Sequence, residues 1–394
     1  MNKKAIVILS TVLVLLLVAG GVFWMFSKKS STEKEPEVIP SFPSGEETGP
    51  GIGAPSGGML PLGEKEAALT KLADGPVSGS SLFAGVATST VRYVEKSTGH
   101  VYEITPDGKE KKRLSNTTIL KTFNISWSSD ADKLVMRYFD GDEGSLGAVK
   151  TFSATLNPLT NSLEGVFLPR ATVAVASSPS EDKIFYLIDG GETASGIISD
   201  FSNQKKRVVF SLPFSDFNVA WPSKNIISLL SKPSAFAGGV LYFLNPRSEK
   251  TEKIIGGVKG LTALVSPNGK KVIYSQTDGR GFKTKILDVS GRSMVDFYAR
   301  TLPEKCAWSE KDEDIVYCAV PYSPPSADYP DDWYKGKISF NDSIAKIDIA
   351  TGETKVLFSE RGFDVINPFL SPDDGYFIFV NKKDGSLWSL KVEQ

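Results

Sequence analysis

The feature that most constrains the fold is a strand–turn–strand–turn–strand unit that recurs along the chain. Its clearest copy covers residues 261–289, where apolar runs at 261–265, 271–276 and 282–289 are separated by Ser-Pro-Asn-Gly and Asp-Gly-Arg-Gly turns. Asn and Gly accept the positive φ that tight hairpin turns need, so these turns between β-branched and aromatic runs predict β-hairpins.

Equivalent copies repeat from one end of the folded region to the other. The first strand of each copy ends at Trp127, Ser177, Trp221, Val265, Trp308 and Leu370, with a weaker copy near Ala84. Most neighbouring positions in this series are roughly 40–50 residues apart, which is the length of a four-stranded propeller blade. The repeats therefore predict an all-β fold over residues 67–394, a seven-bladed β-propeller of four-stranded antiparallel blades.

The last copy offers only three strands before residue 394. A blade of three strands would expose a pairing edge, which folded proteins avoid. The segment at 67–72 is strand-like and resembles the short outer-strand segment at 113–115. We therefore predict that 67–72 pairs with 386–392 and closes the ring.

The N-terminal region has a different composition. Residues 5–26 carry no charge and are flanked by lysines at 3, 4, 28 and 29, which predicts a transmembrane helix acting as a signal anchor behind a short cytoplasmic tail at 1–4. The small residues at 18–21 leave a cleavable signal peptide as the alternative. Residues 27–66 are rich in Ser, Pro, Gly and Glu and predict a disordered tether. We expect a single-pass protein of the cell membrane with its propeller on the extracytoplasmic side.

The turn motifs resemble those of a known repeat family. Trp-Ser-Ser-Asp at 127–130, Ser-Pro-Asn-Gly at 266–269 and Ser-Pro-Asp-Asp-Gly at 371–375 precede apolar strands, as in TolB-like (WD40-like, PD40) propellers. The segments 91–95, 99–104 and 306–309, with a membrane helix and a tether, also resemble uncharacterised bacterial surface proteins. The resemblance implies the propeller fold. TolB itself is a soluble periplasmic protein, so the predicted anchor departs from it and does not imply a role in the Tol system.

Composition excludes several classes of function. The chain has 45 Lys and Arg against 46 Asp and Glu, so it lacks the basic excess of a nucleic-acid-binding surface, and we expect no nucleic-acid partner. His100 is the only histidine and follows Gly99 at a predicted turn, where we expect a polar surface residue. One histidine and two cysteines exclude a His-rich or Cys-rich zinc site, and we expect no cofactor.

The four strands of a blade, A to D from the centre outward, place the B–C loops and the D–A connections at one end of the propeller, here called the B–C face. The opposite end is the A–B face. The A–B turns repeat and are scaffold, whereas the B–C loops vary, at 140–148, 190–196, 232–239 and 321–341. Long, variable loops gathered on a rigid body are the usual place for binding.

The insertion at 321–340 is the strongest candidate for a ligand-binding loop. It carries Tyr322, Tyr329, Asp331, Asp332, Trp333, Tyr334 and Phe340 among several prolines. Exposed, rigid aromatic rings bind proteins or carbohydrates with little loss of entropy. The alternative is that the rings fold onto their own blade or plug the mouth of the central channel.

Two acidic clusters could hold a hard cation through oxygen ligands, one at 140–143 and one formed by Asp328, Asp331 and Asp332. Neither has the spacing of an EF-hand loop, which favours ordinary solvated acids. The same loop carboxylates are the basis of an enzymatic alternative, a glycosidase or lyase.

Cys306 and Cys318 lie six residues on either side of a turn centred near Asp312. Such residues stand opposite each other in an antiparallel hairpin, which predicts a disulfide between them. Two buried free thiols are the alternative, and the predicted anchor favours oxidation.

These observations predict a non-enzymatic binding or scaffold module for a protein or an envelope polymer. The alternatives are the carbohydrate-active enzyme and a purely structural surface spacer. The sequence does not determine the oligomeric state.

Overall fold

The computed structural model describes residues 38–39, 69–85, 89–141 and 148–392, and all of them belong to one compact unit, Val38–Gln394. The predicted cytoplasmic tail, transmembrane helix and most of the tether lie outside the described residues. None of the helices in the described ranges has the length and apolar content needed to cross a membrane.

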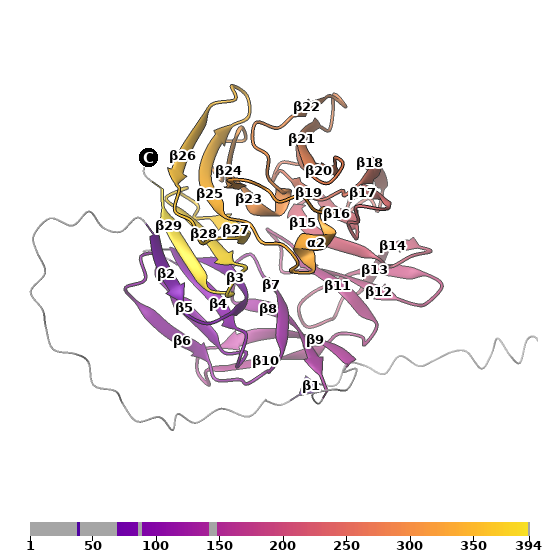
Figure 1. Cartoon of the computed structure of the whole chain (residues 1–394). Coiled ribbons are helices and arrows are strands. Elements are labelled where there is room, and N and C mark those ends of the chain that lie inside the picture. The colour runs from indigo at the N-terminus through magenta and orange to yellow at the C-terminus, as the bar shows by residue number, and fades with distance from the viewer. Residues whose placement is uncertain (1–37, 40–68, 86–88, 142–147, 393–394) are drawn as a thin grey trace, which may run out of the picture. The chain divides into compact units, whose positions relative to one another are not determined.

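The described residues form seven antiparallel sheets arranged as the blades of a propeller (Figure 1), six of four strands and one of five; in six blades the four core strands are consecutive, and in the seventh three consecutive strands are joined by β2 from the N-terminal end. The seven-bladed, all-β prediction is therefore confirmed. Blade 1 contains β3 (Val77–Ala84), β4 (Ser89–Glu95), β5 (Val101–Ile104) and β6 (Lys111–Ser115). Blade 2 contains β7 (Thr122–Trp127), β8 (Lys133–Asp140), β9 (Ala148–Asn157) and β10 (Ser162–Phe167), with β1 (Val38–Ile39) paired to β10. Blade 3 contains β11 (Thr172–Ser177), β12 (Ile184–Asp189), β13 (Ala194–Ser199) and β14 (Arg207–Leu212).

Blades 4 to 7 continue the pattern. Blade 4 contains β15 (Phe217–Ser223), β16 (Ile226–Ser231), β17 (Gly238–Leu244) and β18 (Thr251–Lys259). Blade 5 contains β19 (Ala263–Val265), β20 (Lys271–Thr277), β21 (Phe282–Asp288) and β22 (Met294–Asp296). Blade 6 contains β23 (Cys306–Trp308), β24 (Ile315–Pro321), β25 (Asp342–Asp348) and β26 (Thr354–Phe358), preceded by the 3₁₀ turn η1 (Pro303–Lys305). Blade 7 contains β27 (Val365–Leu370), β28 (Tyr376–Asn381) and β29 (Leu387–Lys391), completed by β2 (Leu69–Ala73).

The last blade is completed by the first strand of the propeller. Leu69 pairs with Leu390 and Thr70 with Ser389, and Figure 1 shows indigo β2 beside yellow β29. The predicted closure by the N-terminal segment is confirmed, with the strand at Leu69–Ala73 rather than 67–72. This pairing covers the edge of β29 that a three-stranded blade would leave open.

The repeated serine of the A–B turns has a specific hydrogen-bonding role. Ser266 Oγ donates to Asn268 (2.8 Å) and accepts from the backbone N–H of Lys271 (3.0 Å). Ser128 and Ser371 make the same two contacts in blades 2 and 7. The hydroxyl thus bridges the two ends of the turn, which explains why a serine with Asp or Asn two residues later marks the repeat.

Apolar side chains between neighbouring blades hold the ring together. Each of the seven blade junctions contains its own cluster of buried residues, and the cluster between blades 7 and 1 includes Leu72 from β2. Trp127 and Trp308 end the inner strands of their blades, Trp221 lies two residues before the end of its inner strand, and all three are buried in these clusters. Every blade therefore packs through apolar side chains on a neighbour at each of its two faces.

Cys306 and Cys318 face each other across β23 and β24 and are joined by a disulfide, with their Cα atoms 4.1 Å apart. Directly opposed residues on two antiparallel strands are close enough for such a bond.

Candidate functional site

The insertion of blade 6 lies on the B–C face and reaches three other blades. The insertion contains a short helix, α2 (Asp331–Tyr334). The carboxylate of Asp331, its first residue, accepts a hydrogen bond from the N–H of Ala235 in blade 4 (2.6 Å). The carbonyl of Tyr329 accepts from the hydroxyl of Thr277 in blade 5 (3.0 Å), and that of Trp333 accepts from Lys382 in blade 7 (2.7 Å). The insertion is therefore anchored to blades 4, 5 and 7 as well as to its own.

Three of the aromatic rings predicted to contact a ligand are instead part of the protein interior. Tyr329, Trp333 and Phe340 are each at most 2% exposed and form a cluster with Phe282 and Leu302. The Tyr329 ring lies 4.7 Å from Phe282 and 5.9 Å from Phe340, measured between centroids. The expectation that these three rings are exposed is wrong, and the alternative in which the rings fold onto their own propeller holds. The physical reason is that a long insertion gains more by burying its rings than by exposing them.

Tyr322 and Tyr334 remain exposed on the B–C face. Their hydroxyls nevertheless bond to the protein, that of Tyr322 to the carbonyl of Ser359 and that of Tyr334 to the carboxylate of Glu304. Burial raises the pKa of Glu304, and burial of the hydroxyl end of Tyr334 together with the neighbouring Glu304 raises the pKa of Tyr334. Each tyrosine is thus partly exposed while its hydroxyl is bound to the protein.

The acids of the insertion support the loop itself. Asp332 accepts from the N–H of Asp328 (3.0 Å) and from Lys337 (2.9 Å), and these contacts lower the pKa of Asp332. Asp328 lies 3.5 Å from Arg280 of blade 5. Among the described residues, no group of His, Cys, Asp or Glu side chains has an arrangement that could hold a metal ion. Of the other acidic cluster, at 140–143, residues 142 and 143 lie outside the described residues.

A buried ionic cluster, which the sequence did not indicate, lies beneath the insertion. Lys305, Asp342 and Asp364 are fully buried, and the Lys305 ammonium donates to Asp342 (2.7 Å), to Asp364 (2.6 Å) and to the carbonyl of Val365 (3.0 Å). The rings of Trp333 and Phe340 cover the ammonium, with centroids 5.0 and 4.7 Å from Nζ. The cluster ties the start of blade 6 to the start of blade 7 beneath the insertion.

Exposed aromatic rings on neighbouring loops continue the surface of the insertion. Phe236, in the B–C loop of blade 4, is 68% exposed, and Phe214, in the connection from blade 3, is 42% exposed. An ion pair between Asp216 and Lys232 (2.6 Å) holds these two segments together, and the Ala235–Asp331 hydrogen bond holds the second against α2. We call Phe214, Phe236 and Tyr334, presented by three adjoining loops, the aromatic row.

The sequence interpretation missed Phe214 and Phe236. Loop 232–239 is variable, but its phenylalanine lies in an otherwise small and polar segment, with no neighbouring aromatic to mark it. Single exposed apolar residues are common on protein surfaces, so the sequence carries no signal that distinguishes this one.

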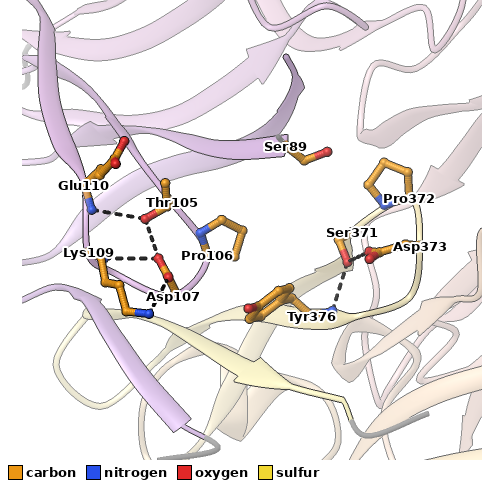
Figure 2. A pocket seen from close by; sticks show the side chains of 10 residues that line it. All are labelled: Ser89, Thr105, Pro106, Asp107, Lys109, Glu110, Ser371, Pro372, Asp373 and Tyr376. Carbon is orange, nitrogen blue, oxygen red and sulfur yellow. Dashed lines mark hydrogen bonds and ion pairs between the residues drawn. The ribbon is translucent and has the colours of Figure 1, made fainter. Parts of the chain in front are cut away.

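A separate hollow of about 610 Å³ lies on the A–B face, where blades 7 and 1 meet. Figure 2 shows Asp107 and Lys109 of blade 1 on one side and Ser371, Asp373 and Tyr376 of blade 7 on the other. The carboxylates belong to turns: Asp107 accepts from Thr105 (2.5 Å) and Asp373 from Ser371 (2.5 Å), and these hydrogen bonds lower both pKa values. Acids held ionised in this way are suited to accepting hydrogen bonds rather than to donating a proton.

The single histidine is buried, which corrects the expected surface position. His100 is 7% exposed, and its Nε2 lies 3.2 Å from the hydroxyl of Thr118, in the connection to blade 2. Burial, together with the charge of Arg113, lowers the pKa of His100. The turn before His100 lies directly against the connection to blade 2, because Gly99 has a positive φ and no Cβ, and a Cβ there would lie 2.3 Å from the carbonyl oxygen of Ile119.

No protein-family model and no curated protein matches the chain. Solved structures match it at low sequence identity. An oligogalacturonate lyase from Vibrio parahaemolyticus is 10% identical, with 81% of this chain and 98% of that chain covered and a TM-score of 0.51. The β-propeller domain of the Trilobed protease from Pyrococcus furiosus is 12% identical, with 81% and 96% covered and a TM-score of 0.52. The Cps50 (Swd1) propeller of Myceliophteria thermophila is 11% identical, with 82% and 98% covered and a TM-score of 0.51.

These similarities establish the propeller fold and no more, because chains of such low identity share a fold without sharing a site. The matched proteins include a lyase and a protease domain, so the fold is compatible with both enzymes and binding modules.

Proposed function

We propose that this protein is a non-enzymatic binding module, tethered to the extracytoplasmic side of the cell membrane, that contacts a protein or an envelope polymer through its B–C face. The aromatic row is the observation that carries the proposal. Three partly exposed rings come from three segments that adjoin one another on this face, and groups of exposed aromatic residues are typical of contact surfaces.

The support beneath the row favours the same conclusion. The insertion bonds to blades 4, 5 and 7 and packs on its own buried rings, so the loops that carry the row are held in place before a partner arrives. A preformed surface binds without the cost of ordering its loops.

The loop carboxylates give less support to the glycosidase or lyase alternative. Asp331 and Asp332 each accept a backbone N–H of the protein itself, and Asp328 lies 3.5 Å from the guanidinium of Arg280. The similarity to an oligogalacturonate lyase concerns the fold alone. Incubation with oligogalacturonate, followed by ultraviolet absorbance of an unsaturated product, tests that alternative, and product formation would refute the non-enzymatic assignment.

Two single alanine variants, one of a phenylalanine on the B–C face and one of a leucine on the A–B face, test the binding face. Phe236→Ala removes the most exposed ring of the row, whereas Leu159→Ala, in the C–D turn of blade 2, removes an even more exposed apolar side chain from the A–B face. Full-length protein is mixed with purified cell-envelope polymer and, separately, with solubilised envelope proteins, and its retention is measured.

We expect Phe236→Ala to weaken retention by about tenfold or more, as for a central aromatic contact, and Leu159→Ala to leave it unchanged. Equal retention of both variants, or no retention of the wild-type protein by either fraction, would refute the proposed face.

A further inference from the structure

The buried cluster of Lys305, Asp342 and Asp364 has the composition and the isolation of a reactive site. All three side chains are 0% exposed, and the two carboxylates are both within 2.7 Å of the same ammonium nitrogen. The aromatic rings of Trp333 and Phe340 lie over that nitrogen and separate it from solvent. Ordinary surface ion pairs in this chain have at least one partner that water reaches, as Lys337 does in its pair with Asp332.

The two carboxylates have unequal hydrogen bonding. Asp364 accepts from Trp333 Nε1 (3.1 and 3.2 Å), from the Ser339 hydroxyl (3.0 Å) and from the Phe340 N–H (3.0 Å), besides Lys305. Burial works against the ionisation of Asp364, but the charge of Lys305 and these donors hold its pKa below the ordinary value. Asp364 is therefore the carboxylate that carries the negative charge.

Asp342 has the opposite character. One of its oxygens accepts from Lys305 and from the Val365 N–H (2.7 Å), but the other, Oδ1, is buried without a hydrogen-bond partner. Burial raises the pKa of Asp342 despite the nearby ammonium. A carboxyl group with an unpaired oxygen in an apolar site is less costly to bury when it is protonated.

The net charge of the three buried side chains also indicates that Asp342 is the protonated carboxyl group. One ammonium and two carboxylates carry a net charge of −1, and removing an unbalanced charge from water is expensive. Protonation of Asp342 makes the buried group neutral. Lys382, the next cation, is half-buried at the edge and donates to the Trp333 carbonyl rather than to a carboxylate.

From this geometry we propose that Lys305 and Asp342 become joined by an intramolecular amide bond, a covalent cross-link within blade 6. Lys305 transfers one ammonium proton to the Asp364 carboxylate, and the resulting amine attacks Cγ of the protonated Asp342. A C–N bond forms, the C–OH bond of Asp342 breaks, and the leaving hydroxyl takes a second proton from the nitrogen and departs as water. The products are a neutral amide, a neutral Asp364 acid and one water molecule, so atoms and charge balance without an oxidant or a further reactant.

The position of the bond indicates its purpose. Lys305 ends η1 just before the inner strand β23, and Asp342 begins β25 just after the insertion. An amide between them closes the base of the insertion covalently, next to the Cys306–Cys318 disulfide on the same blade. The loops of the B–C face would then stay in place even under reducing conditions.

Mass spectrometry of the full-length protein tests the cross-link directly. After reduction of the disulfide, the wild-type mass is compared with that of the Asp342→Ala variant, which cannot form the amide, so that any processing of the N-terminus cancels. We expect the measured mass of the wild-type protein to be lower, by one water molecule, than the mass calculated from that of the variant by allowing for the Asp-to-Ala substitution. A tryptic digest should contain peptide 301–311, uncleaved after Lys305, joined to peptide 338–346.

The Lys337–Asp332 pair, at 2.9 Å on the same insertion but open to water, is the internal control, and its peptides should be unlinked. Asp364→Asn, which removes the proton acceptor, should leave much of the protein at full mass while circular dichroism shows an unchanged fold. A wild-type mass equal to that of the unmodified sequence would overturn the proposal. A link from Lys305 to peptide 362–382 would overturn the assignment of Asp342, and complete cross-linking in Asp364→Asn would overturn the role of Asp364.

Discussion

The ring of blades depends on a short N-terminal strand, and this dependence can be measured with one substitution. Leu72 of β2 is 3% exposed and belongs to the cluster between blades 7 and 1, together with Ile104 and Leu387. The backbone of β2 pairs with β29 on one side only, so its apolar side chains supply much of its attachment. Leu72→Ala should therefore loosen the junction that closes the propeller.

The expected magnitude follows from the burial of this side chain. Replacing a buried leucine by alanine costs about 3 kcal/mol when the surrounding strands cannot collapse into the cavity. Unfolding entropy is about 2.1 cal/mol/K per residue, so a propeller of roughly 320 residues has ~0.7 kcal/mol/K. The two figures together give a fall in Tm of about 4 °C.

Differential scanning calorimetry of the full-length protein measures this shift. Leu159→Ala is the matched control, because it makes the same chemical change at a leucine that is 92% exposed in a turn of blade 2. The control should shift Tm by well under 1 °C, roughly the scale of a surface substitution. If Leu72→Ala lowers Tm no more than the control does, β2 does not close the ring in the way described. Removal of residues 67–73 should lower Tm further, because it also uncovers the edge of β29.

Three further predictions concern the disulfide, the histidine and the membrane topology. Thiol labelling of denatured, unreduced protein should modify neither Cys306 nor Cys318, and two labelled cysteines per chain would show that the bond is absent. Because the folded-state pKa of His100 is lowered, its contribution to stability should be fully present above the unfolded pKa of about 6.5 and should be lost as pH drops through the folded pKa. The variant His100→Gln should flatten this part of a curve of Tm against pH, and an unchanged slope would contradict the assignment. Protease added to intact cells should cut within residues 27–66 and release a folded propeller, and full protection of the propeller would place it in the cytoplasm instead.

Most of the architecture was predictable because it repeats. The turn serines, with Asp or Asn two residues later, act through contacts that span only five residues, as between Ser266 and Lys271. Local chemistry of this kind can be recognised in a sequence, and its recurrence every blade length leaves few alternative folds. The pairing of Cys306 with Cys318 was predictable for the same reason, since both lie on one hairpin.

The candidate site was less predictable because it depends on contacts between distant segments. Tyr329, Trp333 and Phe340 have the composition of a binding loop, yet their burial depends on Phe282 and on the ionic cluster below. A sequence pattern records that a residue is aromatic, but not whether another blade supplies the surface that covers it.

By itself, the sequence determined the all-β class, the number of blades, the closing strand and the register of the Cys306–Cys318 hairpin. Only the tertiary structure decided which aromatic rings face solvent, that Lys305 meets Asp342 and Asp364, and that Phe214 and Phe236 adjoin α2. The difference is physical. Strands and turns are selected by interactions within a few residues, whereas burial and ion pairing are selected by whichever segments the closed ring brings together, here 37 and 59 residues apart for the two contacts of Lys305.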